Sequence, residues 1–400
     1  MARKKKDRKK RLGSPPAFLW FLAYLVLAPY YKLRYRVKVD RGGLGKLRGP
    51  GLVLAPHTAE ADPFLVGLAL YPRRPNYVVS AHFMANPKIR RIFRLLHVIP
   101  KRMFSSDPST ILNIGRAKRE GNLVVLFPEG RLPCSGHSVP VTAGTDALIK
   151  SLKIDVYVVT CHGAYLTFPK WGKSRRGKIR VEVRRLFTAE EAATLPTESV
   201  RARLAEAIRH NDEAAMPGIP YRCAAPAEGV DGILFRCPAY LREGTLSAGG
   251  DRITCTCGHS VRLLPDYRLE GGLFPTLGAW FLWQRETLDL DAPLEASVRV
   301  GTPDACGNMN EAAGEGTVRL DRAALTFSGT VCGEAVEFSL PTDRLGGIPI
   351  TVAKHFDVYH NNRLYFFYPA PDTRLSVKWV VYYDKLLLEK EASTAETIKM

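Results

Sequence analysis

The sequence lacks internal repeats and low-complexity tracts, and beyond residue 31 it lacks any apolar run long enough to cross a lipid bilayer. Repeats at a fixed period would indicate a solenoid or a propeller, and spans of about 20 apolar residues would indicate a polytopic membrane protein. The sequence predicts neither class. Its 400 residues, of which 46% are hydrophobic, instead fit a globular chain of two or three domains.

Cysteine is also scarce. Eight cysteines in 400 residues are far fewer than a small secreted domain uses when disulfides replace a hydrophobic core. We therefore expect the fold to depend on buried apolar side chains rather than on disulfide bonds. Cys134 and Cys161 are expected to be ordinary cysteines without a chemical role.

Acidic residues are too few to balance the basic ones. The chain has 58 Lys and Arg against 39 Asp and Glu, which gives a formal net charge of +19. Such an excess predicts an anionic partner, either nucleic acid or an anionic membrane surface. The charge is concentrated at the start, where residues 1–11 hold eight Lys or Arg and one Asp.

An apolar run, Ala17–Ala28, follows the basic tail and is bracketed by Pro16 and Pro29. As a helix it would be about 18 Å long, which is short for a hydrocarbon layer of roughly 30 Å. We therefore predict a monotopic or re-entrant anchor on the cytoplasmic face, where a basic tail contacts anionic lipids. A secretory signal and a soluble core helix are the alternatives.

The segment from Leu54 to Pro63 places His57 five residues before Asp62. A strand over Leu52–Ala55 would end just before the histidine, and a helix over Asp62–Leu70 would begin at the aspartate. A neutral imidazole is the usual base for removing an alcohol proton at pH 7, and a carboxylate on its other ring nitrogen fixes the tautomer. Taken alone, this spacing could also arise by chance.

A second segment, Phe127-Pro128-Glu129-Gly130-Arg131, follows a predicted buried strand over Asn122–Phe127. Glycine lets the backbone approach a ligand closely, and an arginine fork can bind a phosphate group. A helix over Gly144–Lys150 is predicted beyond it. Without the first segment, this one would be an ordinary exit from a strand into a loop.

Between the two segments, Pro87 begins a predicted helix, which is followed by the basic pair Lys101 and Arg102. Proline is well suited to a first helical position. Lys101 and Arg102 are candidate phosphate contacts, with solvated surface charge as the alternative. Four apolar side chains fall at helical spacing and are predicted to belong to the core: Ile89, Ile92, Phe93 and Leu96.

Together these segments, with an apolar strand predicted over Asp155–Thr160, resemble the signature blocks of the glycerolipid acyltransferases. The resemblance covers roughly residues 35–215. It implies an α/β domain, a mixed sheet with helices on both faces. This sequence departs from the family pattern where Ser80 and His82 replace a usual Lys and Glu, and where Arg131 stands one position early. These departures put the identity of the acceptor in question.

The resemblance implies a membrane-associated O-acyltransferase that needs no cofactor for catalysis. Acyl-CoA or acyl-ACP would be the donor, 1-acyl-sn-glycerol-3-phosphate the acceptor and phosphatidic acid the product. His57 would be the base and Asp62 would orient it. The acceptor phosphate would be held by Glu129, Gly130 and Arg131, with Lys101 and Arg102.

The spacing of the cysteines between residues 220 and 270 resembles that of two metal-binding turns. The turns after Cys237 and Cys255 look like the knuckles of a zinc ribbon, which in an intact ribbon carry C-x2-C twice. Here Tyr240 replaces one cysteine, and Cys257 follows Cys255 after one residue instead of two. We expect a degenerate, metal-free ribbon. A structural zinc bound by Cys223, Cys237, Cys255 and Cys257 is the alternative.

From residue 271 to 400 the sequence changes to short alternating runs, which predict a small antiparallel barrel or sandwich. A closing helix is predicted over Leu375–Lys390, and strands with one closing helix are reminiscent of pleckstrin-like barrels. The predicted strands are Ser297–Val300, Gly316–Leu320, Leu325–Gly329, Val336–Leu340, Ile348–Val352, Asp357–Tyr359 and Arg363–Tyr368.

The predicted organisation has four parts. A basic tail and anchor occupy residues 1–31, and the acyltransferase domain occupies 32–219, with its last helix at Glu198–Ala214. A ribbon-like segment follows at 220–270, and a β-rich domain at 271–400. Two alternatives remain open: the same chemistry on another lysophospholipid, or a basic ribbon-containing protein that binds nucleic acid. The basic tail runs straight into an apolar segment, which argues against nucleic acid as a partner.

Overall fold

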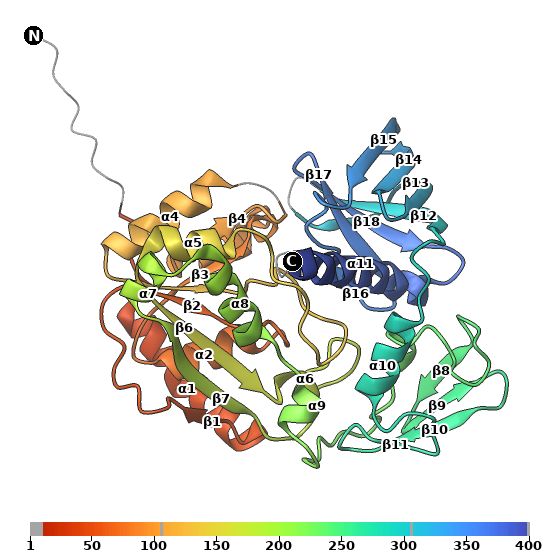
Figure 1. The fold of residues 1–400 in the computed structure, drawn as a ribbon, viewed down its shortest axis with the longest axis horizontal. Helices are drawn as coiled ribbons and strands as arrows, with labels where there is room; N and C mark the ends of the chain where they lie inside the picture. Colours follow the sequence, from red (N-terminus) through yellow and green to blue (C-terminus); the bar gives the residue numbers. More distant parts are fainter. Residues whose placement is uncertain (1–10, 105–106, 305–306, 398–400) are drawn as a thin grey trace, which may run out of the picture.

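The computed structural model of the protein describes residues 11–104, 107–304 and 307–397. Three β-sheets follow one another along this part of the chain (Figure 1). Most of the basic tail that was predicted to meet anionic headgroups lies outside the described residues.

The first sheet has seven strands in the order β1-β7-β6-β2-β5-β3-β4. All neighbouring pairs in it are parallel except β6 and β7, so the predicted mixed sheet is confirmed. The strands are β1 (Lys38–Asp40), β2 (Gly51–Leu54), β3 (Asn76–Ser80), β4 (Ile99–Lys101), β5 (Leu123–Leu126), β6 (Asp155–His162) and β7 (Arg180–Phe187).

Helices cover both faces of this sheet, because successive side chains of a strand point to opposite faces. On β2, Val53 belongs to one buried core, while Leu52 and Leu54 belong to another. The first core is shared with α1 (Ala17–Tyr35) and α2 (Asp62–Leu70). The second core is shared with α4 (Pro108–Arg119), α5 (Thr145–Leu152), α7 (Ala189–Thr194) and α8 (Thr197–Ile208).

Helix α1 continues through Pro29 to Tyr35, beyond the apolar run Ala17–Ala28. A proline inside a helix removes one backbone hydrogen bond and costs about 3 kcal/mol or more. The last turns of α1 offset this cost because Ala28, Tyr31 and Tyr35 are buried in the first core. Within the described ranges, we find no helix with the length and apolar character needed to cross a membrane.

The predicted helix over Glu198–Ala214 is two helices, α8 and α9 (Asp212–Ala215). The break is explained by Asp212, whose buried carboxylate accepts backbone N–H bonds from Gly163 and Tyr165 at 2.6 and 2.8 Å. His210 Nε2 lies 2.7 Å from the same carboxylate. These contacts tie the chain to the short helix α6 (Ala164–Thr167) and prevent α8 from continuing.

The middle sheet is small and antiparallel, in the order β11-β10-β9-β8. Alternate residues of β9 and β10 are buried, including Ile253 and Val261, as expected for a sheet with one solvated face. Helix α10 (Leu277–Glu286) follows it. The strands are β8 (Leu246–Gly249), β9 (Arg252–Cys255), β10 (Ser260–Leu263) and β11 (Leu269–Glu270).

The C-terminal sheet contains all seven predicted strands, in the order β15-β14-β13-β12-β18-β17-β16. Every neighbouring pair is antiparallel. The closing helix is α11 (Ser376–Thr397), and the pleckstrin-like assignment stays a prediction. The strands are β12 (Leu294–Pro303), β13 (Met309–Leu320), β14 (Ala324–Val331), β15 (Glu334–Pro341), β16 (Ile350–Thr351), β17 (His355–His360) and β18 (Arg363–Pro369).

One continuous buried core connects the segment after β6 with the other two sheets, and it runs from Tyr165 and Trp171 through the middle sheet to α11. At the first junction the hydroxyl of Tyr267 donates to the carbonyl of Leu166 at 2.9 Å. Figure 1 shows α11 lying between the C-terminal sheet and the first domain. The C-terminal part can therefore contribute residues to a site in the first domain.

Candidate active site

His57 and Asp62 lie at the carboxyl end of β2, in the centre of the first sheet. Ligands commonly bind at this edge of an open α/β sheet. The chain leaves β2 at Leu54 and enters α2 at Asp62, so the seven residues between them turn back on themselves. This turn brings His57 Nδ1 to 3.1 Å from Asp62 Oδ2.

Asp62 is held rigidly. Its Oδ2 atom also accepts the backbone N–H groups of Thr58 and Ala59, at 2.6 and 2.8 Å, and the residue is fully buried. With Nδ1 of His57 bound to this carboxylate, Nε2 is the nitrogen left for a substrate. A histidine held in this way can take a proton from a hydroxyl group and keep its ring oriented while doing so.

Glu129 lies behind His57 and supports its backbone. One carboxylate oxygen accepts the N–H of His57 at 2.6 Å and the other accepts the N–H of Val139 at 3.0 Å. The residue is 2% exposed and does not line the cavity described below. The predicted contact of Glu129 with the substrate stays a prediction, and in this structure its carboxylate contacts the backbone instead. The sequence did not reveal this contact, because Glu129 and His57 are 72 residues apart.

Burial raises the pKa of Glu129 from 4.5 to about 7, despite the backbone N–H groups that favour its charged form. The folded protein thus keeps this proton up to about pH 7, whereas the unfolded chain releases it near pH 4.5. Between these values the folded state binds more protons, so stability falls as pH rises. We expect this contribution to be complete below pH 4.5 and lost above pH 7, amounting to about 3 kcal/mol.

Urea unfolding of the wild type and of Glu129→Gln at several pH values measures this contribution. The variant carries no titrating group at this position. The unfolding free energy of the wild type should therefore fall relative to that of the variant as pH rises. Parallel pH profiles would contradict the assignment.

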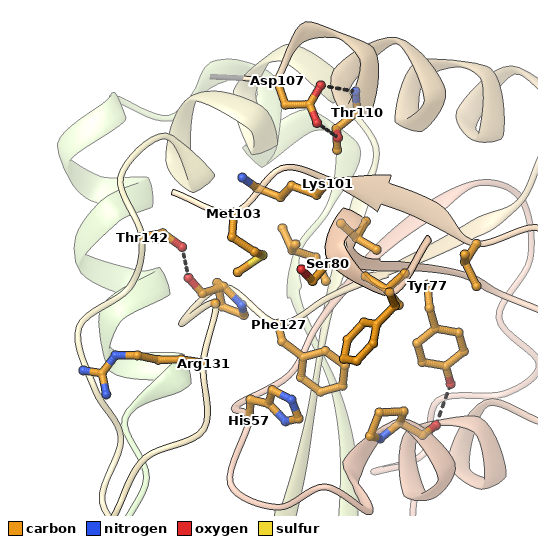
Figure 2. Close-up of a pocket in the computed structure, with 18 of the residues that line it drawn as sticks. His57, Tyr77, Ser80, Lys101, Met103, Asp107, Thr110, Phe127, Arg131 and Thr142 are labelled. Atoms are coloured by element: carbon orange, nitrogen blue, oxygen red, sulfur yellow. Dashed lines mark hydrogen bonds between the residues drawn. The ribbon is translucent and has the colours of Figure 1, made fainter. Parts of the chain in front are cut away.

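A large apolar cavity of about 1370 Å³ opens beside His57. Figure 2 shows the imidazole at its wall next to Phe127, and the two ring centroids are 4.3 Å apart. The walls come from α1, α2, β3, α3 (Pro87–Leu95), α4 and the loop after β5. Small-molecule pockets typically measure roughly 300–1,000 Å³, so this cavity has room for a long apolar ligand.

The apolar stripe of α3 does not belong to the core, contrary to prediction. None of the residues of α3 is buried. Phe93 and Leu96 line the cavity, while Ile92 and Leu95 are 56% and 49% exposed. The spacing correctly predicted an amphipathic helix, but periodicity cannot distinguish a core from a ligand cavity or a membrane surface.

Two of the three predicted cationic phosphate contacts, Lys101 and Arg131, line the same cavity as His57 (Figure 2). Burial lowers the pKa of the Lys101 amine, against the opposing effect of Asp107. Arg102 does not line the cavity. Its guanidinium faces Asp107, with Nε 3.9 Å from the carboxylate, so its predicted role as a substrate contact is not supported by its position.

Gly130 lies at the same wall in a left-handed conformation, with φ of +70°. A Cβ atom there would approach Met103 Cε and Phe104 Cε1 to 3.4 Å. These are ordinary contact distances, so the positive φ rather than crowding favours glycine at this position.

Arg131 is buried and forms an ion pair with Asp384 of α11. Burial raises the pKa of the Asp384 carboxyl, although the arginine opposes this effect. The Arg131 Nη1 atom has no hydrogen-bond partner among the described residues. The sequence alone could not reveal this pair, because its partners are separated by 253 positions.

The C-terminal part also closes one side of the cavity. Asp343, Arg344 and Gly346 line it, although they follow β15. No site residue was predicted in this part of the chain, because such a contribution depends on how the domains pack.

Three of the four predicted zinc ligands come together, and the fourth does not. The sulfur atoms of Cys237, Cys255 and Cys257 lie within 4.8 Å of one another. Cys223 is outside this group, and its thiol interacts with the guanidinium of Arg175. The predicted four-cysteine set is therefore wrong.

Part of the chain is similar in sequence to known acyltransferases. Residues 36–162 match the family model described as Acyltransferase. The 1-acyl-sn-glycerol-3-phosphate acyltransferase of Bacillus subtilis (strain 168) is 23% identical over 161 residues, which cover 40% of this chain and 77% of that protein. The crystal structure of the LPA acyltransferase PlsC from Thermotoga maritima overlaps with a TM-score of 0.40 and 14% identity, over 48% of this chain and 77% of that one.

Proposed function

We propose that residues 36–162, which match the family model described as Acyltransferase, form an acyltransferase domain, and that the protein acylates a lysophospholipid at a membrane surface. The donor is a fatty acyl thioester of coenzyme A or acyl carrier protein. The acceptor is 1-acyl-sn-glycerol-3-phosphate and the product is phosphatidic acid. The contact between His57 and Asp62 at the wall of an apolar cavity is the observation that carries this proposal.

In the proposed reaction, His57 Nε2 takes the proton of the acceptor hydroxyl as its oxygen attacks the thioester carbonyl. An ester C–O bond forms, the C–S bond breaks, and the imidazolium returns the proton to the leaving thiolate. Asp62 orients the ring and stabilises the imidazolium. General-base catalysis of this kind contributes roughly 10²–10⁴ in rate.

The cavity suits a lipid substrate. Its walls are mainly apolar, with aromatic side chains such as Trp20, Phe64 and Phe93. Burial of apolar surface stabilises a bound chain by about 0.8 kcal/mol for each CH2 group. The cations Lys101, Arg131 and Arg344 share the cavity with His57, which supports binding of an anionic headgroup near the base.

Two features of the cavity favour a second acceptor class. Asp384 already neutralises Arg131, and Ser80 lines the cavity where the family usually carries a lysine. Both features weaken the site for a phosphate monoester. A lysophospholipid with an additional cationic headgroup is therefore the alternative acceptor.

Membrane association is supported by an exposed apolar stripe on α1. Five side chains at helical spacing are 44% to 83% exposed, namely Phe18, Phe21, Leu22, Leu25 and Leu33. Apolar residues of α3 and α4, among them Ile92 and Ile111, are half exposed. Contiguous apolar patches on a protein surface mark interaction sites, including membrane contacts. We propose that α1 lies in the cytoplasmic leaflet as a monotopic anchor, with the basic tail on anionic headgroups.

The double variant Phe21→Ser/Leu25→Ser is expected to bind vesicles of phosphatidylglycerol and phosphatidylethanolamine more than tenfold more weakly. Removing two apolar side chains from the lipid should cost on the order of 2 kcal/mol or more. Leu273→Ser is the matched control, because Leu273 is 64% exposed but lies after β11, away from α1. Co-sedimentation measures the binding, and equal binding of both variants would refute the role of α1.

The function is tested with purified protein, labelled acyl-CoA or acyl-ACP and a panel of lysophospholipids presented one at a time. Formation of labelled phosphatidic acid from 1-acyl-sn-glycerol-3-phosphate supports the proposal. Exclusive labelling of a choline or ethanolamine lipid would support the second acceptor class instead.

A further inference from the structure

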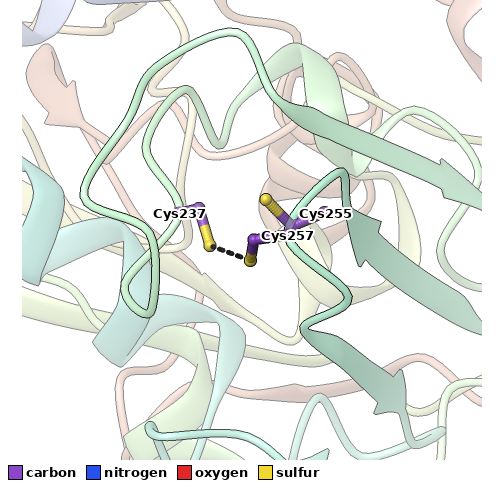
Figure 3. Close-up of side chains that lie close together, drawn as sticks. All are labelled: Cys237, Cys255 and Cys257. Atoms are coloured by element: carbon purple, nitrogen blue, oxygen red, sulfur yellow. Dashed lines mark hydrogen bonds between the residues drawn. The ribbon is translucent and has the colours of Figure 1, made fainter.

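Three cysteine side chains converge at one end of the middle sheet (Figure 3). Cys237 comes from the loop before β8, Cys255 ends β9, and Cys257 lies in the turn between β9 and β10. The sulfur atoms of Cys237 and Cys257 are 3.9 Å apart, and all three lie within 4.8 Å of one another. Cys237 and Cys255 are buried and Cys257 is exposed.

Each side of this cluster is a hydrogen-bonded turn. The N–H of Leu241 donates to the carbonyl of Cys237 at 2.8 Å. On the other side the N–H of Gly258 donates to the carbonyl of Cys255 at 2.9 Å, and Gly258 has a φ of +92° that other residues rarely adopt. The two turns therefore hold their thiols close together. Because the turns are already ordered, little chain entropy is lost when the thiols bind a common ligand.

Neighbouring groups hold two of the sulfur atoms in place. The N–H of Tyr240 donates to Cys237 Sγ at 3.4 Å, and the Cys255 thiol donates to the Thr245 hydroxyl at 3.3 Å. Tyr240, which replaces the expected cysteine of the first knuckle, thus contributes its backbone to the cluster instead of a side chain.

The spacing of the sulfur atoms matches a tetrahedral metal ion. Zn²⁺ binds thiolates at about 2.3 Å, so two sulfur ligands of one tetrahedral ion lie about 3.8 Å apart. The observed 3.9 Å between Cys237 and Cys257 is close to this value. The exposed side at Cys257 leaves a fourth position accessible to water, and His259 in the same turn lies outside the group.

We propose that Cys237, Cys255 and Cys257 bind one Zn²⁺ ion through three thiolates, with water at the fourth position. The ion would fasten the loop before β8 to the β9–β10 turn. It would have no part in acyl transfer, because none of the three cysteines lines the cavity beside His57. The site therefore does not depend on the proposed function.

Metal content of the full-length protein tests this proposal. After loading with Zn²⁺ and removal of excess ion, the wild type should retain about one Zn²⁺ per chain. Cys257→Ser and Cys237→Ser should retain at least tenfold less. Cys332→Ser is the matched control, because Cys332 is exposed in the turn between β14 and β15, and Cys223→Ser should also retain zinc.

Co²⁺ provides a second measurement that does not depend on the folding of a variant. Thiolate-bound Co²⁺ in the wild type should show the visible absorption of a tetrahedral site, and blocking the thiols should abolish it. Equal zinc contents in the wild type and Cys257→Ser would overturn the proposal. So would a disulfide between Cys237 and Cys257 in wild-type protein that cannot be loaded with zinc after reduction.

Discussion

Replacing His57 with alanine is expected to reduce the rate of acyl transfer by about 10²–10⁴-fold while leaving the fold intact. The imidazole lies at the cavity wall, 21% exposed, and its only hydrogen bond from the ring is to Asp62 among the described residues. The supporting contact from Glu129 is made to the backbone N–H of residue 57, which alanine retains. The loss should therefore fall on kcat rather than on stability.

His360→Ala is the matched control for this prediction. Its imidazole stacks on Phe338 in the C-terminal sheet, with ring centroids 4.4 Å apart, and it does not line the cavity. Initial rates with labelled acyl-CoA, together with urea unfolding, separate chemistry from stability. An activity of His57→Ala within threefold of the wild type would show that another group removes the proton.

Replacing Asp384 with alanine is expected to destabilise the protein by about 3–5 kcal/mol. The change would leave the buried guanidinium of Arg131 without its charged partner. An uncompensated buried charge costs more than the ion pair itself contributes. Because Asp384 lies on α11 and Arg131 lies in the first domain, the loss of stability should weaken the packing of α11 against the first domain.

The double variant Arg131→Met/Asp384→Leu is the control for this effect. It replaces both charges with apolar side chains, and such a replacement is often neutral or stabilising. Stability should therefore return towards that of the wild type, as measured by urea unfolding. If Arg131 also holds the acceptor phosphate, the double variant should still show a raised KM for the acceptor. A double variant as unstable as Asp384→Ala would contradict the ion-pair explanation.

Much of the first domain could be predicted because its signals are local in sequence. The apolar strand before His57 and the helix from Asp62 to Leu70 are set by a few neighbouring residues. The contact between His57 and Asp62 spans only five positions. The seven strands of the C-terminal sheet were likewise visible as alternating runs between turn residues.

The features that the sequence could not reveal depend on contacts between distant segments. Asp384 pairs with Arg131 across 253 positions, and Glu129 supports His57 across 72 positions. Helix α1 continues past Pro29 because the side chains of Tyr31 and Tyr35 are buried in the core of the first domain. In each case tertiary packing decides the outcome, and local patterns carry no information about it.

Acceptor competition shows both which lipid the protein acylates and whether His57 is needed. The wild-type protein is given one labelled acyl donor and equal amounts of 1-acyl-sn-glycerol-3-phosphate and its phosphocholine analogue in the same vesicles, beside His57→Ala. We expect label mainly in phosphatidic acid with the wild type, and at least a hundredfold less with the variant. Label mainly in the choline lipid, or equal labelling by both proteins, would contradict this expectation.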